Sequence, residues 1–126
     1  MARAILDTGL TDLRNAVKAR WTHLGVATDT TAFAAGQTAL DPANVGATNL
    51  LIKPATWTDV DGTTADATIT VNGTSELTGR TLFTEGLLTG SARTAAVARV
   101  VRPVGIGVAA GDTFTIGLRV KVTDAT

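Results

Sequence analysis

Apolar and polar residues alternate strictly near the end of the chain, in TFTIGLRVKV at positions 113–122. The apolar positions are Phe114, Ile116, Leu118, Val120 and Val122. Threonine, glycine, arginine and lysine fill the positions between them. Because successive side chains of a strand point to opposite faces, this pattern predicts a strand with one buried face.

Shorter segments of β character precede this strand and are separated by turn residues. We expect strands at residues 23–26, 50–53, 67–72, 80–88 and 95–102. Asn72-Gly73 is a tight-turn signal, and the glycine-rich run 105–111 is typical of a turn or strand edge. Short strands broken by glycine, asparagine and aspartate favour an antiparallel arrangement. The predicted fold class is all-β, mainly an antiparallel β-sandwich, with one short N-terminal helix.

The helix is predicted at residues 10–21, LTDLRNAVKARW, where the apolar period changes to three and four. Its apolar positions are Leu10, Leu13, Val17 and Trp21. Either Thr11 or Asp12 is a suitable N-terminal cap. A helix of about three turns is marginal alone, so we expect it to dock on its own domain or on a neighbouring subunit.

Residues 27–48, ATDTTAFAAGQTALDPANVGAT, show neither period and predict a long loop of small residues. Asp41-Pro42 favours extended or turn geometry at Asp41. Loops of this length in compact domains are usually functional or ordered by a partner, and simple mobility is the alternative. We find no linker and no internal repeat, so residues 1–126 are expected to form a single domain.

The charges cancel, with eleven basic and eleven acidic residues, which argues against nucleic acid as the main ligand. Within 80–121, however, six basic residues face two acidic ones; the basic residues are Arg80, Arg93, Arg99, Arg102, Arg119 and Lys121. This local excess suits an acidic protein surface, or else marks solvated strand faces. Interface residues are therefore expected among Arg93, Arg99 and Arg102, together with Trp57.

Candidate chemistry is sparse. Asp59, Asp61 and Asp66 in TDVDGTTAD are similar to the opening of a calcium loop, but its glycine is at the fourth position and no glutamate closes it. They predict an acidic turn, with a weak cation site as the alternative. The single histidine, His23, has no sequence partner and is expected to hydrogen-bond across strands. Without a nucleophile–base pair, we expect no enzyme activity and no cofactor.

Three further absences bear on the cellular context. The chain has no cysteine, so disulfides and cysteine-ligated metals are excluded. It has no apolar run of about 18 residues, so no membrane span is expected. The N-terminal residues lack the apolar core of a signal peptide, and we expect assembly in the cytoplasm.

Three stretches carry a resemblance to a known family: WTHLGV at 21–26, DTTAF at 29–33 and QTAL at 37–40. In this order they resemble small structural proteins of tailed bacteriophages, in which a THIGVGTGTTAF…QTAL stretch follows an N-terminal helix. Residues 84–88, 98–100 and 113–122 stand where such chains have a strand after a glutamate, an alanine-arginine strand and a final alternating strand. Ala27 replaces a frequent glycine, and DPAN at 41–44 departs from the family pattern, so the resemblance assigns no role to the middle third.

The resemblance implies a virion component. The leading hypothesis is a capsid decoration (cement) protein that bridges neighbouring capsid subunits, since the chain is short, neutral and rich in small residues. Its partners would be the major capsid protein or other virion proteins, and shell geometry suggests a homo-oligomer, with a trimer as the guess. The alternative is a tail or fibre component, possibly a receptor- or glycan-binding module with Trp57 as its exposed aromatic residue.

Overall fold

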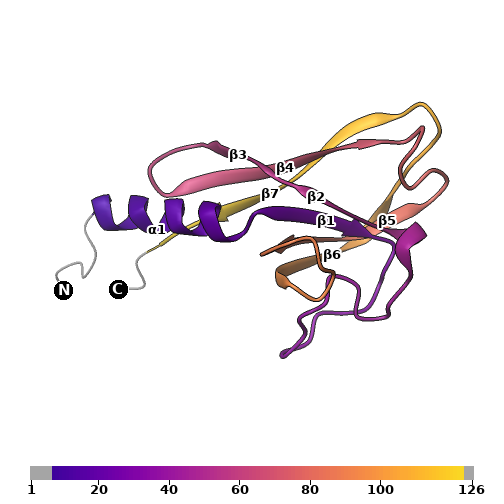
Figure 1. The fold of residues 1–126 in the computed structure, drawn as a ribbon, viewed down its shortest axis with the longest axis horizontal. Helices are drawn as coiled ribbons and strands as arrows, with labels where there is room; N and C mark the ends of the chain where they lie inside the picture. Colours follow the sequence, from indigo (N-terminus) through magenta and orange to yellow (C-terminus); the bar gives the residue numbers. More distant parts are fainter. Residues whose placement is uncertain (1–6, 124–126) are drawn as a thin grey trace.

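A computed structural model describes residues 7–123 of the protein. Its elements are α1 (Asp7–Arg20), β1 (His23–Ala27), the 3₁₀ turn η1 (Ala47–Asn49), β2 (Leu50–Pro54), β3 (Thr56–Asp59), β4 (Thr64–Asn72), β5 (Thr81–Leu88), β6 (Ala96–Gly107) and β7 (Thr113–Lys121). Figure 1 shows the single helix beside a body made of strands. The all-β class with one N-terminal helix is thus confirmed.

The strands form two antiparallel sheets. One has four strands in the order β2-β1-β5-β6, and the other has three in the order β3-β4-β7. Only Ala55 separates β2 from β3, so the chain crosses directly from one sheet to the other there. The sheets face each other, with β1 opposite β4 and β5 opposite β7, in a sandwich-like arrangement (Figure 1).

The main core lies between the sheets and follows the alternation of the strands. Its fully buried members are Leu24, Val26, Ala67, Ile69, Val71, Leu82, Leu87, Val108 and Ile116. In β7 the even-numbered side chains point to this core and the odd-numbered ones are exposed, as the sequence pattern predicted. Burial of this apolar surface is the dominant favourable term in folding.

The helix differs from the prediction at its start and on its exposed face. It begins at Asp7, so Thr11 and Asp12 lie inside it and neither is its cap. Leu10 is buried, but Leu13 is 45% exposed, so the predicted apolar face is only partly used. The prediction was wrong for Leu13, while Leu10 is buried and Trp21 packs against the main core.

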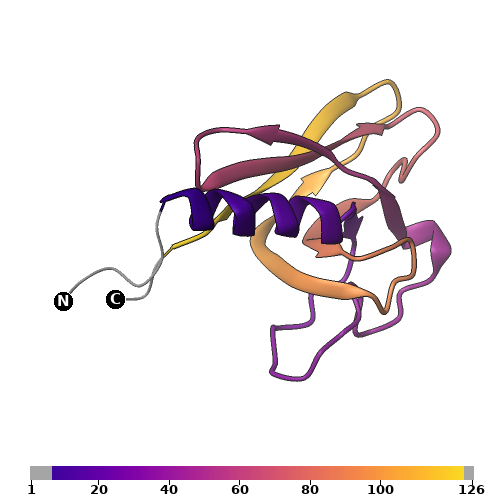
Figure 2. The same cartoon turned by 60° about the vertical axis from the view of Figure 1, so that its left-hand side comes forward.

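The helix meets a polar turn that connects β3 to β4 within the same chain (Figure 2). Thr11 donates from Oγ1 to the carbonyl oxygen of Gly62 at 2.9 Å, and Arg14 donates to the carbonyl oxygen of Asp61. Lys18 donates to a carboxylate oxygen of Asp59 at 2.7 Å. Polar side chains one turn apart therefore attach the helix to its own sandwich.

The sequence analysis missed one strand and predicted two others too short, since β4 begins at Thr64 rather than at residue 67 and β6 also extends further. Strand β3 has only four residues, three of them polar, so alternation gave no signal for it. Strand β6 continues to Gly107, beyond the predicted end at residue 102, and includes Pro103. Proline is accepted there because β6 is an edge strand, where a missing N–H leaves no gap between strands.

Candidate functional site

The loop of residues 28–46, which we call the anchored loop, covers the outer face of the four-stranded sheet. This face lies away from the main core and away from β3 and β4 (Figures 1 and 2). Gly25 and Gly86 are directly opposite each other in the β1–β5 pair, with no side chains. Leu40 of the anchored loop fills the notch above them and is fully buried.

Leu40 belongs to a second apolar cluster on this outer face. Ala27 and Leu88 are also fully buried, and none of the three belongs to the main core. The nearest atoms to a β-carbon at Gly25 include Ile52 Cγ1 at 3.0 Å and Leu88 Cδ1 at 3.2 Å. The sheet is therefore packed on both faces, and the anchored loop provides the second layer.

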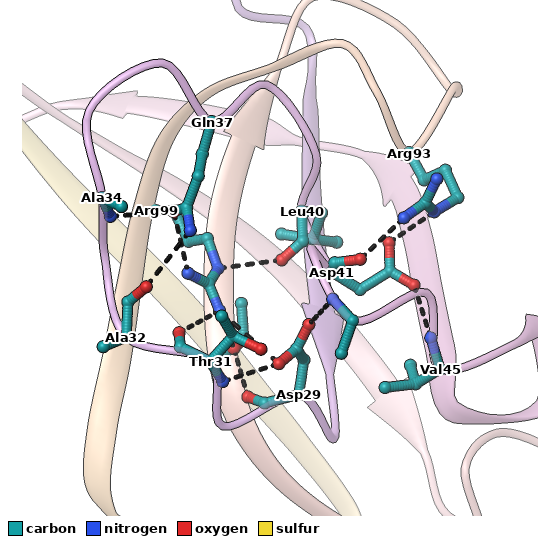
Figure 3. Close-up of polar contacts among 12 residues, drawn as sticks. Asp29, Thr31, Ala32, Ala34, Gln37, Leu40, Asp41, Val45, Arg93 and Arg99 are labelled. Atoms are coloured by element: carbon teal, nitrogen blue, oxygen red, sulfur yellow. Dashed lines mark hydrogen bonds and ion pairs between the residues drawn. The ribbon is translucent and has the colours of Figure 1, made fainter.

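Arg99 on β6 fixes the path of the anchored loop. Its guanidinium donates from Nε to the carbonyl oxygen of Leu40 at 3.0 Å and from Nη2 to that of Thr31 at 2.6 Å (Figure 3). Its Nη2 also lies 3.8 Å from Oδ1 of Asp29. The side chain is only 4% exposed, so these contacts are shielded from water.

Asp29 is the acidic partner in this arrangement. Its carboxylate accepts hydrogen bonds from the backbone N–H of Thr31 at 2.6 Å and of Ala43 at 2.8 Å, which joins both ends of the loop. Burial by itself raises the pKa of Asp29, but the hydrogen bonds from Thr31 and Ala43 and the charge of Arg99 outweigh it. The net pKa of Asp29 is below its ordinary value, so the carboxylate is ionised at neutral pH.

A second ion pair, between the buried Asp41 and the partly exposed Arg93, holds the later part of the loop. Arg93 donates from Nε to Oδ1 of Asp41 at 2.6 Å and from Nη2 to its carbonyl oxygen at 2.6 Å (Figure 3). The other carboxylate oxygen accepts the N–H of Val45 at 3.1 Å. Leu40 donates its N–H to the carbonyl oxygen of Arg93 at 2.7 Å. Asp41 is fully buried, so its charge depends on these donors.

The tip of the anchored loop presents an aromatic side chain to solvent. Phe33 is 73% exposed, although Gln37 holds the backbone on either side of it. The amide of Gln37 donates to the carbonyl oxygen of Ala32 at 3.2 Å and accepts the N–H of Ala34 at 3.1 Å. Phe33 and Val97 of β6 border a shallow hollow of about 40 Å³, whose floor includes Ala98. We define Phe33, Val97 and this hollow as the loop-tip surface.

The interface role expected of the four candidates stays a prediction, but the structure assigns internal partners to each. Arg93 and Arg99 hold the anchored loop, as described above. Arg102 donates from Nε to Oε1 of Glu85 at 2.7 Å. The indole N–H of Trp57 donates to the carbonyl oxygen of Trp21 at 2.9 Å, and the ring packs against the main core.

The basic excess of residues 80–121 is largely neutralised by carboxylates from earlier in the chain. Arg93 meets Asp41, Arg99 meets Asp29, and Arg119 meets Asp66 in a two-pronged contact at 2.8 and 3.0 Å. The predicted alternatives were an acidic partner surface or solvated strand faces. For these arginines the structure shows a third arrangement, in which they form ion pairs within the chain.

The three candidate cation ligands have separate partners. Lys18 lowers the pKa of Asp59, the N–H and hydroxyl of Thr63 lower that of Asp61, and Arg119 lowers that of Asp66. Asp61 accepts the N–H of Thr63 at 2.9 Å, a contact that fits the acidic-turn interpretation. Across residues 7–123, no three histidine, aspartate or glutamate side chains gather as they would around a metal ion.

His23 also differs from its expected contact. Its Nδ1 lies 2.8 Å from the hydroxyl of the adjacent Thr22, rather than bonding across strands. Because its neighbour supplies the partner, the ring does not connect β1 to another strand through that nitrogen.

Comparison with known proteins leaves the resemblance to phage proteins as a prediction: no family model, no curated protein and no solved structure matches the chain. In the described part of the chain, no helix has the length and apolar character needed to cross a membrane.

Sequence reasoning missed the anchoring residues Asp29, Asp41 and Leu40. Each lies in a segment without periodicity, and each has partners more than fifty positions away, such as Arg93 for Asp41. One signal was available. Glycine at 25 and 86 lies inside predicted strands, and glycine inside a strand often marks a close approach by another segment.

Proposed function

We propose that the protein is a non-enzymatic virion structural protein of a tailed bacteriophage, a decoration protein that bridges neighbouring capsid subunits. The observation that carries this proposal is the loop-tip surface. Phe33 is exposed on a loop that Leu40 and two ion pairs with buried carboxylates attach to a sheet. A rigid loop with an exposed aromatic residue is suited to binding, because little conformational entropy is lost when it docks.

The rest of the chain supports a binding role for this surface. Aromatic residues are enriched at protein interfaces and anchor many of them. The loop-tip hollow, at about 40 Å³, has room for little more than one water molecule, so it suits a protein surface better than a small substrate. Several such contacts on one shell would reinforce each other.

The tail or fibre alternative depended on Trp57 as an exposed binding residue. Trp57 is half-buried, and its indole N–H is already bonded to Trp21. We therefore retain the decoration role as the proposal and treat tail location as an outcome of the test.

The experiment uses shells assembled from the major capsid protein encoded in the same genome. We expect the protein to co-sediment with these shells, and Phe33→Ser to weaken binding at least about tenfold, as for an interface anchor. Leu13→Ser, at another exposed apolar position, is the matched control and should bind normally. Absence of binding, labelling of virions only at the tail tip, or equal loss in both variants would reject the proposal.

A further inference from the structure

Strand β7 has a long free edge. It pairs with β4 over nine residues in unbroken register and, within residues 7–123, has no strand on its other side. Gly73 donates to the carbonyl oxygen of Asp112 at 2.6 Å, and Val122 donates to that of Thr63 at 2.9 Å. In an antiparallel pair, alternate residues of a strand bond to the neighbouring strand. These two bonds show that the even-numbered residues of β7 bond to β4. The odd-numbered residues direct their backbone N–H and C=O groups outward: Thr113, Thr115, Gly117, Arg119 and Lys121.

The other edges in the described structure are shorter or interrupted. Strands β2 and β3 have five and four residues. Strand β6 has a register shift between its pairs with Leu82 and Thr84 of β5, and Pro103 lies in the unpaired stretch. Proline and bulges protect edge strands from pairing with other chains, and β7 has neither.

The sandwich is also incomplete beside this edge. With β1 opposite β4 and β5 opposite β7, no strand of the smaller sheet is left to lie opposite β6. Ala98 of β6 packs against the main core, and Val100, two residues later, points to the same inner side. Val100 is nevertheless 47% exposed. Strand β6 therefore extends beyond the smaller sheet and leaves apolar surface uncovered.

Burial of the inner side chains also decreases from β1 and β4 toward β6 and β7. On β1 and β4, Leu24, Val26, Ala67 and Val71 are at most 1% exposed. On β6 and β7, by contrast, the apolar inner side chains are mostly only partly buried: Ala98, Ile106, Phe114, Leu118 and Val120. One vacant strand position next to β7 and opposite β6 accounts for both observations.

We infer that the occupant of this position is β6 of a second copy of the protein. In a two-fold dimer whose axis runs parallel to the strands, β6 of each copy lies beside β7 of its partner. The four-stranded sheet of each copy then continues into the three-stranded sheet of its partner. The dimer has two such continuous sheets, packed face to face. The four-on-three sandwich is self-complementary, because the strand that extends beyond one copy fills the vacancy of the other.

Strand direction is compatible with this contact. Since β3 continues β2 across Ala55, β7 runs in the same direction as β5, and β6 runs opposite to both (Figure 1). A two-fold axis parallel to the strands preserves direction, so β6 of the partner meets β7 antiparallel, like every other pair in the fold. The N–H of Ala96 already bonds to the carbonyl oxygen of Thr38 in the anchored loop, so the segment between Ala96 and Pro103 provides the paired part of β6.

Pairing of β7 with β7 of a second copy does not fit. It would place β5 of the partner, which lies opposite its own β7, in the space that β6 already occupies. The reciprocal β6–β7 contact avoids this collision. It also brings together the inner faces on which Val100 is exposed.

The test is the oligomeric state of the purified chain, measured by sedimentation equilibrium and by light scattering after size exclusion. We expect a dimer, and at least about tenfold weaker association for Val100→Asp, because it would place a second carboxylate beside the buried Glu85, the cross-strand neighbour of Val100, at the contact. Thr115→Pro should weaken the dimer similarly, because it removes an outward N–H without breaking the ladder to β4. Val60→Asp changes a residue of equal exposure, 47%, in the turn between β3 and β4, and should remain dimeric.

A second measurement does not depend on the variants. Hydrogen exchange at the outward N–H groups of Thr115 and Gly117 should slow as protein concentration rises. A monomer at all concentrations, the trimer suggested by shell geometry, or a dimer unaffected by both Val100→Asp and Thr115→Pro would overturn the inference. The dimer inference is independent of the proposed virion role, because dimerisation of the purified chain is measured without any capsid.

Discussion

The side chain of Leu40 occupies the place above Gly86 where any other residue would carry its β-carbon. A β-carbon at Gly86 would lie 2.6 Å from Cδ1 of Leu40 and 2.8 Å from the carbonyl oxygen of Ala98. Leu40 comes from the anchored loop and Ala98 from the neighbouring strand β6. Glycine is therefore required at this position by close approach, because real β-carbon contacts are longer.

Gly86→Ala should destabilise the protein by about 1–3 kcal/mol, since overpacking forces either the loop or the strand to move. Urea unfolding measures the change in free energy, and limited proteolysis within residues 28–46 shows whether the loop has been displaced. Gly90→Ala is the control, because no atom lies within 4 Å of a β-carbon there. Equal destabilisation at both glycines would contradict the close-approach explanation.

Leu40→Ala should cost about 2–5 kcal/mol, because it empties a fully buried site on the outer face. The same change makes room at Gly25, whose β-carbon would otherwise collide with Leu40. Gly25→Ala should therefore cost less in the Leu40→Ala background than in the natural chain, with a coupling of about 1 kcal/mol. Additive effects in this double-mutant cycle would show that Leu40 does not fill the glycine notch.

The strands that could be predicted are those whose inner side chains alternate with polar ones. Strand β7 is the clearest, and its predicted buried face is correct from Phe114 to Val120. Strand β3 was missed because four residues with a single large apolar side chain, Trp57, contain no period. The order of strands in each sheet follows from packing between distant segments, which local alternation does not encode.

The candidate site was harder to predict because its charges are paired over long distances in sequence. Arg99 reaches the carbonyl oxygen of Thr31, 68 positions earlier, and that of Leu40, 59 positions earlier. From sequence alone, such an arginine cannot be distinguished from one that faces a partner. The long loop at 27–48 was correctly located, yet its attachment to the sheet depended on side chains that no local pattern identifies.

Arg99→Met should destabilise the protein by about 3–5 kcal/mol, because it leaves the buried carboxylate of Asp29 and two carbonyl oxygens without their cation. Arg119→Met tests the same substitution at an exposed ion pair. The Arg119 side chain is 61% exposed, against 4% for Arg99, so its loss should cost about 0–1 kcal/mol. Chemical unfolding compares the two variants, and similar losses would show that the Arg99 contacts do not hold the loop.

Acid should weaken the attachment of the anchored loop to the sheet. The folded-state pKa of Asp29 is below the unfolded value of about 3.9, so its ionised form stabilises the fold at higher pH. This contribution is fully present above the unfolded value and is lost as pH falls through the folded one, in the range below about 4. Hydrogen exchange at Thr31 and Ala43, whose N–H groups bond to this carboxylate, reports the release.

Asp29→Asn should lower the protection of these two N–H groups at neutral pH and remove most of its acid dependence, because an amide does not titrate. Asp59→Asn is the matched control. Lys18 lowers the pKa of Asp59 too, but this carboxylate attaches α1 and has no contact with the loop. It should leave loop protection and its acid dependence unchanged. If loop protection still falls with acid in Asp29→Asn as it does in the natural chain, another group controls the loop.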